Sequence, residues 1–280
     1  MIQVIINADD LGISLNVNKR IEEAIAAGVI TSSTIMANGS AFEDAVRIAK
    51  QHPEISFGAH LNIIEFAPLT NSRIFQKYGL LNANGEFIEG AIYLVPHYSE
   101  ELKRAIFEEF DAQISKITNA GINISHIDSH QHTHTIYDLR DVILSLMQKH
   151  KILRVRRCRI PSIKLMLLGA KKEKIILDKS KAVIQPKRNV VWRRFHLFVV
   201  KYQCYRWLQL FRSKAKITDK FYAYHTLCDN WQLLKRSVDG KCVELMCHPA
   251  HPSYEFETQK VFNKSLNKLT DVRLITYNDL

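Results

Sequence analysis

Residues 2–37 read IQVIINADDLGISLNVNKRIEEAIAAGVITSSTIMA, and this stretch predicts the fold class. Residues 2–8 form an apolar run that is typical of a buried strand. Apolar residues then recur at helical spacing from about Asn16 to Ala27, and a glycine follows as a stop signal. A second strand is expected over Ser32–Ala37. Strand and helix alternate with short links, which predicts an α/β fold with a parallel sheet.

The same alternation continues along the chain. Further helices are expected from Ser40, where Ser40 and Glu43 fit a capping box, and from Ser99. The remaining expected elements are the strands Ile55–Leu61, Ile122–Asp128, Leu153–Arg156, Val243–Cys247 and Val272–Thr276, and the helices Tyr137–His150 and Glu257–Leu269. A closed barrel and a doubly wound open sheet both fit this order, and both carry chemistry at the carboxyl ends of their strands.

Carboxylates and imidazoles stand where these expected strands stop. Asp9 and Asp10 end the first strand, His60 the third, and His248 the last long one. The densest group is His126-Ile127-Asp128-Ser129-His130-Gln131-His132-Thr133-His134, which places four histidines and an aspartate within nine residues. Because carboxyl ends of parallel strands share one edge, we expect these side chains to form one site.

Several roles stay open on the residues alone. One of Asp9 and Asp10 would bind a metal while the other acts as general base, or the pair would cap a helix. His130 is the leading ligand candidate in the histidine group. His132 and His134 would share its face if the segment stays extended, although all three cannot fit one metal. We expect one of these histidines to bind substrate and one to support a metal ligand from behind.

Two further residues receive supporting roles. Asp128 would orient a histidine, or cap a turn. Arg156 would orient Asp9 or bind a substrate anion, and the same roles apply to Arg154, Arg157 and Arg159, although most of these arginines could equally belong to a solvated basic surface. At the end of its strand, the His248 imidazole is placed to protonate a leaving amine.

The ligand types indicate one divalent metal ion as cofactor. Oxygen and nitrogen ligands without thiolates suit zinc, and the carboxylate content also permits magnesium, manganese or cobalt. The five cysteines form no Cys-x-x-Cys pair, and the first residues lack the features of a signal peptide. We therefore expect a cytoplasmic protein.

The positive charge is concentrated in one segment. The chain carries a formal charge of +11, yet residues 151–216 alone contain 20 Lys or Arg and two Asp or Glu. A helix is expected over Trp192–Phe211, with aromatic residues at helical spacing and interspersed basic residues. It has too many charges to span a bilayer, but it fits an anionic membrane surface. The residues expected to touch that surface are Trp192, Arg193, Arg194, Phe195, Phe198 and Trp207.

Five sequence motifs, taken together, resemble the YdjC-like carbohydrate deacetylase family. They occur in the family's order and cover roughly residues 2–160 and 240–280. The motifs are Asn7-Ala8-Asp9-Asp10-Leu11-Gly12, Thr31-Ser32-Ser33-Thr34 with Asn38-Gly39, Gly58-Ala59-His60-Leu61-Asn62, residues 126–134, and Cys247-His248-Pro249.

The resemblance implies a distorted (β/α) barrel, TIM-barrel-like, forming a single deacetylase domain over residues 1–280. It implies that Asp10, His60 and His130 bind the metal. Asp9 would be the general base and His248 the general acid when metal-activated water attacks the acetamide carbonyl of an N-acetylated sugar. The continuation Ala250-His251 departs from the family pattern, which more usually has glycine there.

The basic stretch 160–225 does not align with that pattern and is expected to be a helical insertion. It suggests a glycan carried on a lipid at the inner face of the membrane, and its stripe would otherwise cover the barrel or a homodimer interface. Two other functions remain: another metal-dependent amidohydrolase in which His132 and His134 are ligands, and a non-catalytic basic module binding membrane or nucleic acid. Nucleic acid is not expected, because no stacking platform is evident.

Overall fold

The computed structural model describes residues 1–70, 73–158, 190–250, 254–263 and 271–280, with side chains of the helix at 190–212 described from Phe198 onward. In this part of the chain, seven strands form one parallel sheet in the order β4-β3-β2-β1-β6-β5, with β7 also beside β1. The strands are β1 (Ile2–Leu11), β2 (Ser32–Ile35), β3 (Ser56–Leu61), β4 (Ile127–Ser129), β5 (Lys220–Ala223), β6 (Cys242–Cys247) and β7 (Val272–Leu274).

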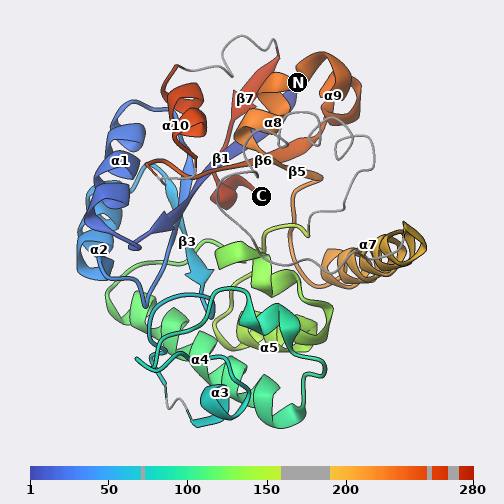
Figure 1. Ribbon diagram of the computed structural model, residues 1–280. Helices are drawn as coiled ribbons and strands as arrows, with labels where there is room; N and C mark the ends of the chain where they lie inside the picture. Colours follow the sequence, from blue (N-terminus) through green and yellow to red (C-terminus); the bar gives the residue numbers. More distant parts are fainter. Residues whose placement is uncertain (71–72, 159–189, 251–253, 264–270) are drawn as a thin grey trace.

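The sheet curves into a half-barrel surrounded by helices (Figure 1), so the predicted α/β class and barrel-like architecture are confirmed. The open edge is extended beyond β4 by a short segment, in which Val155 bridges to Ile127 and Arg154 bridges to Lys216. This segment replaces the strand predicted over Leu153–Arg156. Its position brings the side chain of Arg156 to the inner side of the sheet, where Arg156 meets Asp9.

Helices flank the sheet on several sides (Figure 1). The helix predicted from Ser99 is formed, and the Ser99 hydroxyl caps it by accepting a hydrogen bond from the amide of Leu102. The capping box at Ser40 is wrong: the Ser40 hydroxyl donates to the carbonyl of Ile13, and the helix begins at Phe42. The helices are α1 (Leu15–Ala26), α2 (Phe42–Gln51), α3 (Arg73–Lys77), α4 (Glu100–Asn119), α5 (Arg140–Lys149), α7 (Val190–Arg212), α8 (Tyr224–Asp229), α9 (Trp231–Val238) and α10 (Glu255–Phe262).

Short 3₁₀ turns complete the description: η1 (Ala91–Leu94), η2 (His130–Thr135), η3 (Tyr137–Leu139) and η6 (Tyr277–Asp279). The helix predicted over 137–150 is thus split into η3 and α5. The predicted strand over 122–128 is reduced to β4. Of the helix predicted over 257–269, only the part up to Phe262 forms α10 among described residues, and 264–270 lie outside them.

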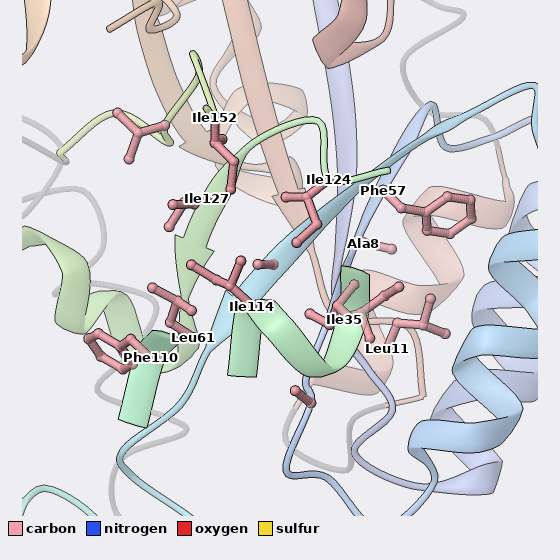
Figure 2. Packing of buried hydrophobic residues seen from close by; sticks show 14 of the residues in the cluster. Ala8, Leu11, Ile35, Phe57, Leu61, Phe110, Ile114, Ile124, Ile127 and Ile152 are labelled. Carbon is pink, nitrogen blue, oxygen red and sulfur yellow. The ribbon is translucent and has the colours of Figure 1, made fainter. Parts of the chain in front are cut away.

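The period of two along each strand separates core from site. In β1, Val4, Ile6 and Ala8 join the hydrophobic core beneath the helices. Their neighbours Asn7 and Asp9 are buried with polar partners instead. Figure 2 shows this core between the sheet and α4, where Ile114 and Phe110 lie beside Leu61 and Ile127. The opposite face carries these polar residues beside a smaller apolar cluster that includes Ile5 and Ile275.

The basic segment predicted as an insertion over 160–225 is only partly described, because 159–189 lie outside the described residues. Its described part contains α7, which agrees with the helix expected over 192–211 and projects from the body of the protein (Figure 1). It also contributes β5, an unpredicted strand of the sheet. Within the described residues, none of the helices has the length and apolar character needed to cross a membrane.

Candidate metal-dependent active site

The two adjacent carboxylates at the end of β1 reach the same site because the backbone changes there. Asp10 has a left-handed backbone with φ of 69°, and the pairing of β1 with β2 shifts register between Ala8 and Leu11. In a regular strand, consecutive side chains point to opposite faces. The irregularity removes this constraint, as β-bulges beside active sites do. Asp9 and Asp10 are therefore both buried at the same site.

Asp10, His60 and His130 form a compact group. One ligand atom from each lies within 4.8 Å of the others, and all three residues are buried. Asp10 Oδ1 is 3.1 Å from His60 Nε2 and 2.9 Å from His130 Nδ1. One carboxylate oxygen and two imidazole nitrogens are a donor set that divalent zinc and related ions accept. Asp10, His60 and His130 could therefore bind a divalent metal ion together.

Electrostatic coupling within this group is strong. Burial alone would lower the pKa of His60, but the charge of Asp128 and the hydrogen bond to Asp10 raise it to about 10. Burial likewise opposes protonation of His130, yet its bond to Asp10 raises its pKa to about 9. For Asp10, burial raises the pKa, and the two imidazoles outweigh it and hold the pKa well below its usual range. The buried carboxylate of Asp10 therefore stabilises a positive charge on the side chains that contact it.

Asp128 lies behind His60. Its Oδ1 is 2.7 Å from His60 Nδ1, and its Oδ2 is 2.7 Å from Arg156 Nη1. The hydroxyl of Thr34 donates to the same Oδ2 over 3.1 Å. This arrangement orients the imidazole so that Nε2 faces Asp10, as carboxylates behind metal-binding histidines do.

Asp9 is held by a buried guanidinium. Arg156 donates from Nη1 to Asp9 Oδ2 and from Nη2 to Asp9 Oδ1, each over 2.6 Å. Asn7 adds a bond to Oδ1 over 2.8 Å. Burial raises the pKa of Asp9, but the charge and hydrogen bonds of Arg156 prevail and lower it strongly. Asp9 is thus an ionised carboxylate with a fixed plane.

His248 follows β6 and lies on the other side of Asp9, with Nε2 at 3.9 Å from Asp9 Oδ2. Its Nδ1 is 3.2 Å from Oε2 of Glu257, which also accepts the His248 amide. The His225 Nδ1 lies 2.7 Å from the other Glu257 oxygen, and the Tyr254 ring stacks on His248. Burial lowers the pKa of His248, but the hydrogen bond to Glu257 and the charges of Asp9 and Asp10 together outweigh it, so that the pKa is raised.

His132 and His134 would share the face of His130 only if this segment were extended. That condition is not met, because Gln131 and His132 have left-handed backbones within η2. His134 is buried, with Nδ1 bonded to the Ser129 hydroxyl and Nε2 near the Arg156 carbonyl. The ring of His132 lies edge-on to Phe221 at a centroid distance of 5.5 Å. Neither residue belongs to the ligand group that contains His130.

The predicted membrane-contacting residues divide into three cases. Side chains of Trp192, Arg193, Arg194 and Phe195 lie outside the described residues. Phe198 is 68% exposed, as expected. Trp207 is wrong as a surface anchor: it is fully buried, stacks on Phe211 and donates from Nε1 to the His134 carbonyl.

Three residues of the polar cluster were not predicted: Glu244, Glu257 and Tyr277. Glu244 carried a usable signal, since it is a lone acid inside the apolar run of β6 with the same parity as His248. Glu257 and Tyr277 carry none in sequence, because their roles arise only when α10 and η6 pack against the sheet. Thr34 belongs to the Thr31-Ser32-Ser33-Thr34 motif, but the sequence predicted no role for it. In the structure its hydroxyl lies between Asp128 and His60.

Together, the site combines an oriented anionic carboxylate, a nearby imidazole and a buried group suited to a divalent ion. A fixed carboxylate can accept a proton from water, and an imidazole with a raised pKa can donate one to a leaving group. A bound cation would stabilise negative charge developing on a substrate oxygen. The arrangement fits hydrolysis of a carbonyl compound.

Comparisons with known proteins agree with this chemistry. The family model described as "YdjC-like protein" matches residues 3–278. A carbohydrate deacetylase of Brevibacillus brevis is 35% identical over 150 residues, which are 54% of this chain and 57% of that protein. A carbohydrate deacetylase of Geobacillus stearothermophilus is 37% identical over 148 residues, or 53% and 57%. The matched part therefore spans little more than half the length of these relatives.

A solved structure shows the same fold along nearly the whole chain. It is the crystal structure of an Enterococcus faecalis protein described as a candidate cellobiose-phosphate cleavage protein. It superimposes with a TM-score of 0.68 over 99% of this chain and 98% of that one, at 20% sequence identity. At this identity, the similarity establishes the shared architecture.

Proposed function

We propose that this chain, which belongs to the YdjC-like family, is a metal-dependent hydrolase that removes the acetyl group from an N-acetylated sugar. The observation that carries the proposal is the placement of Asp9 between Arg156 and His248, next to the group of Asp10, His60 and His130. Amide hydrolysis needs a base for water, an acid for the amine and charge stabilisation for the carbonyl oxygen. Each requirement has a separate candidate here.

Asp10, His60 and His130 would hold the divalent ion. When bound, the ion would supply Lewis-acid charge, which polarises the acetamide carbonyl and lowers the pKa of water. The donor set suits zinc, and its carboxylate also permits magnesium, manganese or cobalt. Asp128 supports the proposal because it fixes the orientation of His60 from behind.

Asp9 would accept the proton of the attacking water. Its two oxygens are fixed by Arg156, so the carboxylate plane is set before substrate arrives. His248 would protonate the departing amine, and Glu257 both orients its ring and favours the protonated form. Proton acceptance and donation thus fall to different residues.

The proposal is tested by measuring acetate release from UDP-N-acetyl sugars, chitooligosaccharides and a lipid-linked N-acetyl sugar. We expect release by the wild type and its loss in Asp9→Asn and His130→Ala. Asp111→Asn and His150→Ala are matched controls, since these residues pair with each other on α4 and beyond α5. Release that survives in Asp9→Asn would contradict the assigned base.

The same assay separates the amidohydrolase alternative. In that reading, His132 and His134 bind the metal, so His132→Ala would lose metal. In the deacetylase, metal content stays with His132→Ala and is lost with His130→Ala. The positions of both nitrogens of His134, which are bonded to Ser129 and the Arg156 carbonyl, support the deacetylase.

We also propose that the sugar is carried on a lipid and that α7 lies on an anionic membrane surface. Phe198, Tyr202 and Tyr205 are exposed on the described part of α7, and Lys201 and Arg206 are interspersed. Exposed aromatic rings with basic neighbours suit the headgroup region. The buried Trp207 and Phe211 would fix the helix to the protein body.

Vesicle flotation tests this surface. Wild type is expected to float with phosphatidylglycerol vesicles, and Phe198→Glu with Tyr202→Glu is expected to abolish flotation. Leu15→Glu is a control for an exposed apolar residue at the start of α1. Absence of wild-type binding would refute the membrane proposal, and a dimer dissociated by the α7 substitutions would assign that face to a second copy.

A further inference from the structure

The Arg156 guanidinium, which binds Asp9, is itself bound by a second carboxylate. Arg156 is fully buried, and its Nε donates to Glu244 Oε1 over 2.6 Å. Glu244 is also fully buried, and its other oxygen accepts the hydroxyl of Tyr277 over 2.5 Å. Asp9 and Asp128 each contact the site directly, whereas both Glu244 oxygens are taken by Arg156 and Tyr277. Glu244 therefore touches the site only through Arg156.

Tyr277 comes from η6, after β7, and its place is fixed by three contacts. Its amide donates to the Ser56 hydroxyl over 3.1 Å, and its hydroxyl donates to Glu244. Its ring lies flat on the ring of His126, with centroids 3.4 Å apart and planes 9° apart. In Figure 1, the end of the chain that carries this turn lies amid the strands.

Gly58 makes room for this stack. A Cβ built at Gly58 would lie 2.5 Å from Cε1 of the His126 ring, a separation that real Cβ atoms essentially never show. The ring of His126 therefore covers the glycine on β3 and supports Tyr277 from the other side. A tyrosine packed in this way has one position for its hydroxyl, which is the position that meets Glu244.

We infer that Glu244 and Tyr277 are positioning residues for the base, fixing the Nε edge of Arg156 so that its two terminal nitrogens meet Asp9. The inference rests on the proposed function, since Asp9 is the base only in that reaction. A guanidinium is planar, so a bond at Nε sets the direction of the two terminal donors. Displacement of this plane would misplace the Asp9 carboxylate.

The hydrogen bond from Arg156 to Glu244 depends on the charge of Glu244, and that charge depends on Tyr277. Burial raises the pKa of Glu244 to about 7, against the lowering effects of Arg156 and the Tyr277 hydrogen bond. Without the hydroxyl, the pKa rises further, and Glu244 is protonated over more of the neutral range. A neutral carboxyl binds the guanidinium more weakly. Loss of the hydroxyl should therefore impair activity most at low pH.

The experiment compares Tyr277→Phe with Tyr98→Phe across a pH series of acetate release. Tyr98 is a matched control, because it is buried and its hydroxyl donates to the Ile92 carbonyl over 2.7 Å, away from the polar cluster. For Tyr277→Phe, kcat should fall roughly tenfold or more at pH 7, since small misplacements of reacting groups are costly. KM and metal affinity should stay unchanged, and kcat should recover as pH rises. Equal kcat profiles in Tyr277→Phe and Tyr98→Phe would overturn the inference.

A second readout does not depend on activity. The ¹⁵N resonance of the Arg156 Nε–H, assigned by its loss in Arg156→Lys, reports the bond to Glu244. The proton should exchange slowly in wild type and in Tyr98→Phe, and rapidly in Tyr277→Phe. Unchanged slow exchange in Tyr277→Phe would overturn the inference. If the wild type releases no acetate, the proposed function fails, and this readout still decides whether Tyr277 fixes Arg156.

Discussion

Arg156 donates two parallel hydrogen bonds of 2.6 Å to Asp9, although the two residues lie on separate segments of the sheet. Asp9 lies near the end of β1, and Arg156 follows the short bridged segment beyond β4. Two parallel bonds fix both the position and the plane of a carboxylate, which one bond cannot do. Because both groups are buried, water competes little for either partner.

The first prediction concerns this pair. Arg156→Lys should lower kcat/KM for acetate release about a hundredfold, because an ammonium cannot make both bonds and the base loses its alignment. Arg47→Lys is the control, since Arg47 pairs with Glu22 and Asp44 at the exposed surface. Steady-state kinetics on purified, folded variants provides the measurement. Equal kcat/KM in Arg156→Lys and wild type would contradict the role of the pair.

The second prediction concerns metal affinity. Asp128→Asn should weaken binding of the divalent ion roughly 10- to 100-fold, because the bond that orients His60 loses its charge. Titration calorimetry on chelator-treated protein measures this change. Asp111→Asn removes a carboxylate from an ion pair on α4 and should leave the affinity unchanged. An unchanged affinity in Asp128→Asn would remove Asp128 from the metal-supporting role.

The third prediction concerns the core between α4 and the sheet. Ile114→Ala should lower the free energy of unfolding by about 2–5 kcal/mol, because Ile114 is fully buried and its loss leaves a cavity (Figure 2). Leu94 is 83% exposed, so Leu94→Ala should change stability little. Chemical denaturation gives both values. Equal effects of the two substitutions would show that Ile114 is not part of the packed core.

The fourth prediction concerns pH. Burial raises the pKa of Glu257, but hydrogen bonds from His225 and His248 lower it to about 2 in the folded protein. A carboxyl whose pKa is depressed on folding stabilises the fold at pH above its ordinary value near 4.5, and this stability is lost as pH falls toward 2.

Glu257→Gln should therefore be less stable than wild type at pH 6 by about 3 kcal/mol, from the size of this shift. The difference should shrink steadily between pH 4.5 and 2. Unfolding free energies measured across this range test the prediction. A difference between the two proteins that is independent of pH would show that Glu257 is not held ionised by the histidines.

Much of the fold and site could be predicted because short-range signals agree with tertiary structure in this chain. Apolar runs became parallel strands, and the polar residue that ended each run reached one edge. Asp10, His60 and His130 come from three strand ends, which the parallel sheet brings to one edge. The order and direction of strands predict this shared edge, whereas the left-handed backbone that turns Asp10 into the site is seen only in the structure.

Predictions failed where the backbone left regular geometry or where burial depended on distant partners. Strand parity would place His132 and His134 on the face of His130 only in an extended segment, and left-handed residues at Gln131 and His132 end the strand pattern. Trp207 has the spacing of a surface aromatic stripe, yet it packs on Phe211 beneath the helix. Periodicity shows that a helix has an apolar side, and it does not show what covers that side.

The most direct test of the account is a metal titration of acetate release with chelator-treated wild-type protein. Zinc, magnesium, manganese and cobalt are added separately, and His130→Ala is titrated alongside. A metal-dependent deacetylase should show no release without metal and a restoration that saturates at one ion per chain, with no restoration in His130→Ala. Full release from metal-free protein, or equal restoration in His130→Ala, would contradict a metal-dependent deacetylase centred on Asp10, His60 and His130.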